Sequence, residues 1–295
     1  MAQPKFEKNP PHNDSLILSF PTPHILLVTI NREKAMNSIP FAVHWAMHAL
    51  FTWFDAEPEL RVAVITGKGK KSFCAGQDLI ELGKRREAAA GGKGGEGSED
   101  AKIVEMVRSM AGHPPSGFAG ISRRVGKKPI IAAVNGFALG GGFEIVLNCD
   151  MVVASPNATF GLPEALRGIY AGAGGLPRLL RNTSLPLANE IALTARFLTA
   201  QEALNFQLIN KVSKSQESVV DEAIALAGKV AAISPDAIIV SRAAIREAWE
   251  RDSVERAFQT ADDRWRDGLM SGENTREGLL AFKEKRQPKW KPSKL

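Results

Sequence analysis

The sequence AAVNGFALGGGFEIVLNCD, residues 132–150, joins an apolar strand-like run to a helix through three consecutive glycines. Glycine has no Cβ, so a ligand can approach the backbone closely at residues 140–142. The first N–H groups of a helix have no partner inside it, and the helix dipole favours negative charge at that end. This segment therefore predicts a site that accepts an oxyanion.

Two carboxylates accompany this segment. Glu144 follows the glycines inside an otherwise apolar helix, where an unsatisfied charge would be costly. Glu164 follows Pro163, which favours the first turn of another helix, and the glycine-rich residues 172–175 predict a tight turn soon after. Two carboxylates near such turns are candidates for an acid/base pair. The alternative for either residue is an acid that only stabilises a helix N-terminus.

Apolar strand-like runs alternate with helical patterns up to about residue 180, and helical patterns alone follow. This order predicts an α/β core with a helical C-terminal part. The Gly-rich stretch 88–100 is typical of a mobile surface loop. The predicted strands lie at 15–20, 24–30, 61–66, 129–134 and 151–154. The predicted helices lie at 40–55, 101–110, 143–149, 188–195, 200–206, 216–232, 235–249, 253–270 and 274–286.

The composition excludes several classes of protein. Hydrophobic residues make up 44% and charged residues 24% of the chain, which is typical of a globular protein and excludes bulk disorder or a fibrous repeat. No run of about 18 apolar residues is present, so no membrane-spanning helix is expected. The excess of 38 Lys+Arg over 32 Asp+Glu gives a net charge of +6, which suggests a phosphate-bearing partner. The basic residues lack interleaved aromatics, so RNA binding is the weaker hypothesis.

Other chemical motifs do not favour a metal or a nucleotide cofactor. His44 and His48 lie four residues apart, but this spacing on a predicted helix is typical of a packed helix face. Cys74 and Cys149 stand in apolar surroundings and are interpreted as small core residues. The dinucleotide and P-loop glycine patterns are both absent. No metal site and no bound cofactor are therefore expected.

The chain ends in Ser293, Lys294 and Leu295. A terminal Ser-Lys-Leu is read by a receptor as a peroxisomal address. The tail therefore predicts a peroxisomal location and an import receptor as partner. The alternative is a basic tail that ends in these residues by chance. Residues 1–13 lack the apolar run of a secretory signal.

Several of these motifs together resemble the crotonase superfamily, and within it the enoyl-CoA hydratases. The resemblance covers nearly the whole chain. Residues 132–150 are similar to the family pattern AAVNGxALGGGxELxxxCD almost residue for residue. Other matching stretches lie at 31–38, 72–79, 160–164, 172–178 and 276–286.

The resemblance implies a crotonase-like fold, in which repeated ββα turns form a spiral core and a helical C-terminal region mediates trimerisation. Trimers of this family often pair into hexamers. The expected domains are a flexible N-terminus at 1–14, the spiral core at 15–198, the helical region at 199–290 and the tail at 291–295.

The resemblance also implies an acyl-CoA thioester as substrate, with CoA as part of that substrate rather than a cofactor. Backbone N–H groups would polarise the thioester carbonyl, and the matching positions are Ala75 and Gly141. The positions expected to bind substrate or CoA are Ala75, Gly76, Gln77, Asp78, Gly141 and Lys285.

Hydratases of this family add water across the 2,3 double bond with two glutamates. Matched by position, Glu144 would deprotonate the water and Glu164 would deliver a proton to C2. The expected function is therefore a peroxisomal enoyl-CoA hydratase, as in fatty-acid β-oxidation. The alternatives are a double-bond isomerase or a hydratase in a specialised biosynthetic pathway. Ala171 and Pro177 replace the family's usual Pro and Gln, and the segment between Asp78 and Pro129 is longer than usual. In the family this segment lies over the acyl chain, so the resemblance leaves room for an unusual acyl chain.

Overall fold

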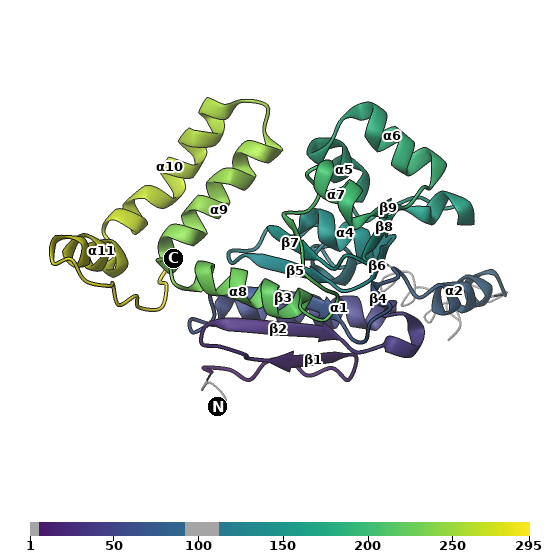
Figure 1. Ribbon diagram of the computed structural model, residues 1–295, viewed down its shortest axis with the longest axis horizontal. Helices are drawn as coiled ribbons and strands as arrows, with labels where there is room; N and C mark the ends of the chain where they lie inside the picture. Colours follow the sequence, from purple (N-terminus) through teal and green to yellow (C-terminus); the bar gives the residue numbers. More distant parts are fainter. Residues whose placement is uncertain (1–5, 92–111) are drawn as a thin grey trace, which may run out of the picture.

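The computed structural model describes residues 6–91 and 112–295. Within these residues a six-stranded sheet has the order β1-β2-β3-β5-β7-β10 (Figure 1). Only the β1–β2 pair is antiparallel, as the short turn between the two strands predicts. The strands are β1 (Leu16–Ser19), β2 (Ile25–Ile30), β3 (Val62–Gly67), β5 (Ile130–Val134), β7 (Met151–Ala154) and β10 (Lys211–Val212).

A second sheet, with the order β4-β6-β8-β9, is built from very short strands. Its strands are β4 (Ser72–Cys74), β6 (Phe137–Leu139), β8 (Thr159–Gly161) and β9 (Leu198–Thr199). The first three are parallel, and each is followed by a segment of the candidate site described below. The sequence patterns did not predict this sheet.

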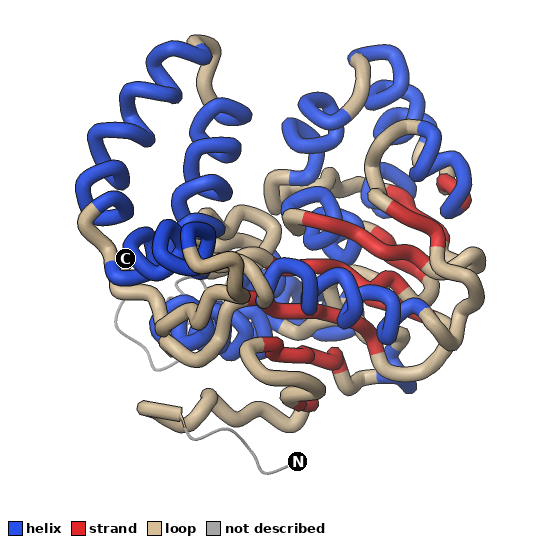
Figure 2. Tube along the Cα trace, turned by 60° about the vertical axis from the view of Figure 1, so that its left-hand side comes forward, coloured by secondary structure: helices blue, strands red, loops and turns tan. Residues whose placement is uncertain are grey.

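The helices cover both faces of the first sheet, and the strands lie between them (Figure 2). One face packs on α8 through Val219, Ala223 and Ala227, and the other face joins the main apolar core. Because both faces are buried, β3 and β5 are continuous apolar runs rather than alternating ones. The helices are α1 (Phe41–Ala56), α2 (Leu79–Gly91), α4 (Gly141–Asn148), α5 (Gly175–Asn182), α6 (Leu185–Thr194), α7 (Ala200–Asn205), α8 (Val219–Ala231), α9 (Pro235–Glu250), α10 (Val254–Met270) and α11 (Glu273–Lys283). Three short 3₁₀ helices are η1 (Glu33–Ala35), η2 (Phe118–Gly120) and η3 (Pro163–Arg167).

The C-terminal helices α9, α10 and α11 extend to the left of the sheets in Figure 1. Asp150, at the start of β7, ties α9 to the core. Its carboxylate accepts hydrogen bonds from Arg242 Nε at 2.9 Å, from Arg246 Nη2 at 3.0 Å and from the Ile130 N–H at 2.8 Å. This cluster is largely buried, so each charge depends on the others for compensation.

The predicted α/β core with a helical C-terminal part is confirmed. Each predicted helix that lies in the described residues overlaps an observed one, with ends that differ by a few residues. The predicted loop at 88–100 is wrong in its first residues, because α2 continues to Gly91. The rest of that stretch and the predicted helix 101–110 lie outside the described residues. Helix α5 was not predicted.

No single helix of the described segments is both long and apolar enough to cross a membrane. Helices α8 and α9 reach that length and composition only as a pair, which is bent by 105°.

Candidate active site

A cavity of about 400 Å³ opens where the second sheet meets the N-terminus of α4. Backbone and side chains from β4, α4, η3 and the turn before α5 converge on it. Both predicted glutamates, Glu144 and Glu164, line this cavity. The other lining residues used below are Ala75, Gly76, Gln77, His113, Phe118, Gly140, Gly141, Tyr170 and Ala173.

The three glycines at the N-terminus of α4, Gly140 before the helix and Gly141 and Gly142 in its first turn, are required by close packing. Gly140 has φ +56°, and a Cβ there would stand 3.1 Å from Glu164 Oε1. A Cβ at Gly141 would overlap the Phe118 ring at 2.6 Å, and one at Gly142 would lie 2.0 Å from the Cys74 carbonyl oxygen. Any larger residue would therefore push the helix N-terminus away from the cavity.

Several backbone N–H groups at the cavity lack a partner in the described part of the chain, and two of them lie just after β4 and at the start of α4. These two belong to Gln77 and to Gly141, the first residue of α4. The Ala75 N–H is unavailable, because it donates to the Met36 carbonyl at 3.1 Å. The prediction that Ala75 supplies an oxyanion donor is therefore wrong. The free N–H of that turn is the one of Gln77.

Glu144 is held in one position by the turn before α5. The Gly175 N–H donates to Glu144 Oε1 at 2.8 Å, and the side chain is only 2% exposed. Burial raises the pKa of Glu144, while hydrogen bonds from the Gly175 and Ala173 N–H groups act in the opposite direction. This carboxylate is therefore fixed, buried and stabilised in its charged form by the backbone.

Glu164 has different surroundings. Its Oε2 atom is buried and has no hydrogen-bond partner within residues 6–91 and 112–295. Burial raises the pKa of Glu164 to about 7, and the negative charge of Glu144 adds to the rise. The charges of the two groups interact, so they titrate as a coupled pair. The Glu144 carboxylate accepts the N–H groups of Gly175 and Ala173, whereas the backbone hydrogen bond to Glu164 comes from its own N–H. Different surroundings of this kind suit one carboxylate, Glu144, to act as a base and the other, Glu164, to act as an acid.

The side chain of Gln77 adds a feature that the sequence patterns did not predict. Its Oε1 atom lies 2.9 Å from His44 Nε2, and His44 Nδ1 accepts the Ala119 N–H at 2.9 Å. His44 is fully buried in α1. Since the three residues come from separate segments, only the fold brings them together.

Two predicted contacts with CoA fall outside this cavity. Asp78 forms an ion pair with Arg32 at 3.0 Å, and its carboxylate also accepts the Glu81 N–H at 3.2 Å near the start of α2. Lys285 follows α11, which lies at the opposite end of the molecule from α2 (Figure 1). Within one chain, therefore, Lys285 does not reach the cavity. Ala75, Gly76, Gln77 and Gly141 do line it, as predicted.

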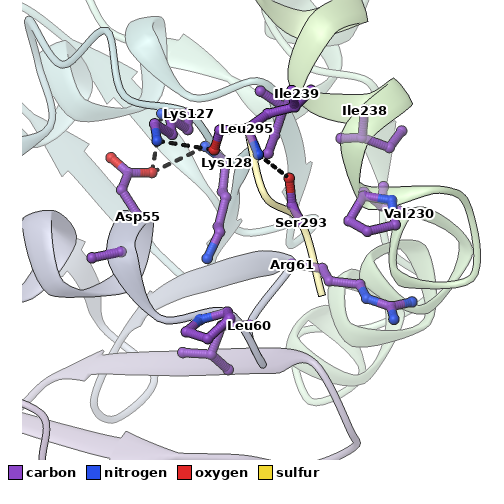
Figure 3. A pocket seen from close by; sticks show the side chains of 13 residues that line it. Asp55, Leu60, Arg61, Lys127, Lys128, Val230, Ile238, Ile239, Ser293 and Leu295 are labelled. Atoms are coloured by element: carbon purple, nitrogen blue, oxygen red, sulfur yellow. Dashed lines mark hydrogen bonds between the residues drawn. The ribbon is translucent and has the colours of Figure 1, made fainter. Parts of the chain in front are cut away.

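The last three residues of the chain contact other parts of the protein. They are Ser293, Lys294 and Leu295. Ser293 Oγ donates to Asp236 of α9, and Lys294 pairs with Glu273 of α11. Leu295 lies beside Lys127, whose Nζ donates to the Leu295 carbonyl oxygen at 3.0 Å (Figure 3). Ser293 and Leu295 line a separate small cavity, with Lys127, Lys128 and Arg61 among its other residues.

The described residues contain no group of three or more His, Cys, Asp or Glu side chains arranged to hold a metal ion. His44 and His48 instead hydrogen-bond to protein groups, since His48 Nδ1 lies 2.7 Å from Ser116 Oγ. Cys74 is fully buried, and burial raises its pKa to about 12, which keeps the thiol protonated.

The fold and the cavity define a class of enzyme. Two unpaired N–H groups can stabilise a developing oxyanion, and two carboxylates in different surroundings can move a proton on and off carbon. These features are the ones expected of a crotonase-fold enzyme. Residues 22–107 and 121–293 match the family model "Enoyl-CoA hydratase/isomerase". The chain belongs to this family, and it is an enzyme of the enoyl-CoA hydratase type.

Individual relatives have narrower names. The chain is 46% identical over 291 residues to the mevalonyl-coenzyme A hydratase SIDH of Beauveria bassiana, covering 98% of this chain and 99% of that protein. It is 37% identical over 275 residues to a carnitinyl-CoA dehydratase of Proteus mirabilis, covering 90% and 95%. The crystal structure of enoyl-CoA hydratase from Mycobacterium tuberculosis superposes with a TM-score of 0.79 at 32% identity, covering 95% and 100%.

Proposed function

We propose that this enzyme interconverts mevalonyl-CoA and the corresponding 2-enoyl-CoA by removal or addition of water. The observation that carries the reaction is the geometry of the cavity, where Glu144 and Glu164 share one space with the free N–H groups of Gln77 and Gly141. The choice of acyl group is supported by the 46% identity with a mevalonyl-coenzyme A hydratase along nearly the whole chain.

In the hydration direction the thioester oxygen accepts hydrogen bonds from the N–H groups of Gln77 and Gly141. Glu144 takes a proton from water while the water oxygen bonds to C3, and the electrons of the double bond move toward the thioester oxygen. The resulting enolate collapses as protonated Glu164 gives its proton to C2. One water molecule is thereby added, and dehydration follows the same steps in reverse.

The raised pKa of Glu164 supports its role as the acid. At a pKa of about 7 a large share of this carboxyl is protonated at neutral pH. Glu144, which accepts backbone N–H groups, is suited to remain charged and act as the base. The N–H donors are part of the folded backbone, so they need little reorganisation as charge develops.

Incubation of the purified protein with mevalonyl-CoA tests the proposal. We expect conjugated enoyl-thioester absorbance to appear, with a kcat/KM about tenfold or more above the values for 3-hydroxybutyryl-CoA and carnitinyl-CoA. Glu144→Gln and Glu164→Gln should each lower kcat by roughly 10²–10⁴-fold, the usual contribution of a general acid or base. Circular dichroism of both variants controls for folding. Absence of turnover with all three thioesters would contradict the proposed function.

Location and assembly are proposed on separate grounds. The Ser-Lys-Leu tail supports a peroxisomal location and an import receptor as partner, which stay predictions. A trimer or hexamer is supported by exposed apolar side chains on α10, where Val254 is 78% and Phe258 59% exposed. An assembly would also be the setting in which Lys285 could reach a bound CoA.

The 46% identity with SIDH favours a specialised pathway over fatty-acid β-oxidation.

A further inference from the structure

The side-chain amide of Gln77 is only half satisfied. Its Oε1 atom pairs with His44, but its Nε2 atom is buried and has no hydrogen-bond partner among the residues that the structure describes. Buried donors are nearly always paired in folded proteins, because an unpaired one is costly. The lone carboxylate oxygen of Glu164 is accounted for by proton transfer, whereas the Gln77 amide plays no part in the proposed chemistry.

The orientation of this amide is fixed by its neighbours. The Ala119 N–H donates to His44 Nδ1, so that nitrogen cannot carry a proton of its own. Burial lowers the pKa of His44 to about 3, so the ring is neutral and its single proton lies on Nε2. His44 Nε2 therefore donates to Gln77 Oε1. A flipped amide would place two donors against each other, so the NH₂ group must face away from His44.

Gln77 lies in the wall of the active cavity, with its buried amide beside His44. The His44 ring is 4.5 Å from the Phe118 ring and 4.7 Å from the His113 ring, measured between centroids. Phe118 and His113 both line the cavity, as does Gln77 itself. The backbone N–H of Gln77 stands at the place proposed for the thioester oxygen. Gln77 thus connects the place proposed for the thioester oxygen with a group of rings, two of which line the same cavity.

The NH₂ group of Gln77 favours an acyl chain that carries an oxygen atom. The NH₂ group offers two hydrogens and no lone pair, so its complement is an acceptor on the acyl chain. An apolar chain would leave the donor unpaired, and the quaternary ammonium of a carnitinyl group has no lone pair to offer. A hydroxyl a few bonds from the thioester carbonyl would satisfy it.

We infer that Gln77 Nε2 donates a hydrogen bond to a hydroxyl group on the acyl chain and thereby selects hydroxylated acyl-CoA substrates. His44 and the Ala119 N–H act as positioning groups that hold the amide in its donating orientation. The inference rests on the proposed function, because it assigns a residue to the distal hydroxyl of a mevalonyl-type chain.

A pair of substrates that differ only in this hydroxyl tests the inference. They are 5-hydroxy-3-methylpent-2-enoyl-CoA and 3-methylpent-2-enoyl-CoA. The wild-type enzyme should favour the hydroxylated substrate in kcat/KM by about tenfold or more, as expected for a buried donor that is otherwise unpaired. In Gln77→Met, which keeps the length of the side chain and removes the donor, this ratio should fall toward one.

The ratio is the readout because both substrates use the same N–H groups at the thioester, so any general loss of activity cancels. Gln77→Asn, a milder change that withdraws the donor, should lower the ratio as well. Gln201→Met, on the exposed face of α7, is the matched control and should leave the ratio unchanged.

Three results would count against the inference. Equal turnover of both substrates by the wild-type enzyme would overturn it while the proposed function stands. A preference that survives both Gln77 variants would overturn the role of this residue. Failure of the wild-type enzyme to hydrate either substrate would overturn the proposed function itself, together with the inference built on it.

Discussion

Glu144 and Glu164 are chemically identical side chains with different surroundings. Glu144 accepts a hydrogen bond from the Gly175 N–H at 2.8 Å, whereas Glu164 Oε2 has no hydrogen-bond partner in the described part of the chain. Burial raises the pKa of both groups. The N–H groups of Gly175 and Ala173 offset it at Glu144, whereas at Glu164 the backbone hydrogen bond comes from the residue's own N–H alone. The division of labour between the acid and the base is thus set by where the backbone places its N–H groups.

The raised pKa of Glu164 carries a cost in stability. Its pKa is about 7 in the folded protein and 4.5 in ordinary surroundings, so the folded state binds more protons between these values. The contribution of Glu164 to the free energy of unfolding is therefore fully present below about pH 4.5 and is lost as the pH rises through 7. Gln is neutral throughout, so Glu164→Gln should be more stable than wild type at pH 8 by on the order of 2 kcal/mol. The two should converge near pH 4.5.

Urea unfolding of both proteins between pH 4.5 and 8 measures this difference. Only the gap between the two curves matters, because all other groups titrate in both proteins. Parallel curves would show that Glu164 has an ordinary pKa, and the acid role proposed for it would lose its physical basis.

Among the secondary-structure elements, the longer ones were predictable and the ones that build the site were less so. Strands β3 and β5 are continuous apolar runs of strand length, and helix α8 has apolar residues at helical spacing. The strands β4, β6 and β8 have three residues each, which is too short for a pattern. They exist because adjacent spiral turns pair with one another, and that pairing joins residues far apart in the sequence.

The candidate site follows the same division. Glu144, Glu164 and the glycines of α4 were predictable because they stand beside local glycine-rich patterns. The choice between the N–H groups of Ala75 and Gln77 was not, because it depends on a carbonyl of Met36 in another segment. The contact between His44 and Gln77 also joins residues far apart in the sequence, so no motif of neighbouring residues predicts it.

The start of α5 tests the link between an element and the chemistry. A Cβ at Gly175 would stand 2.5 Å from Glu144 Cγ, so Gly175→Ala should displace the carboxylate. A displacement of about 1 Å can lower a catalytic rate roughly 100-fold, and we expect kcat to fall by about that factor.

Gly228→Ala in α8 is the matched control, because a Cβ there meets nothing within 4 Å. It should keep full activity and stabilise the protein by about 0.5–1 kcal/mol through better helix propensity. Steady-state kinetics and thermal unfolding distinguish the two variants. Full activity of Gly175→Ala would contradict the proposed fixing of Glu144 by this turn.

The molecule as a whole depends on one buried charge cluster between the core and the C-terminal helices. Asp150 compensates Arg242 and Arg246 of α9. Removing one partner of a buried ion pair leaves the others uncompensated, so Asp150→Asn should lower the free energy of unfolding by about 3 kcal/mol. Urea denaturation measures this loss.

Glu247→Gln provides the comparison, since it breaks the more exposed pair between Glu247 and Arg251 within α9. We expect it to cost less than about 1 kcal/mol. Equal losses in the two variants would show that the cluster at Asp150 is no more important than a surface ion pair.

The two N–H groups proposed to hold the thioester oxygen belong to the main chain of Gln77 and Gly141. Every amino acid except proline carries such a group, so single replacements at Gln77 alter the cavity wall and leave the oxygen-binding N–H in place. Over evolutionary time a lineage can thus exchange one acyl group for another without rebuilding the apparatus that activates it. Diversification of substrates within such a scaffold requires few mutations, and the wall beside His44 is where they would accumulate.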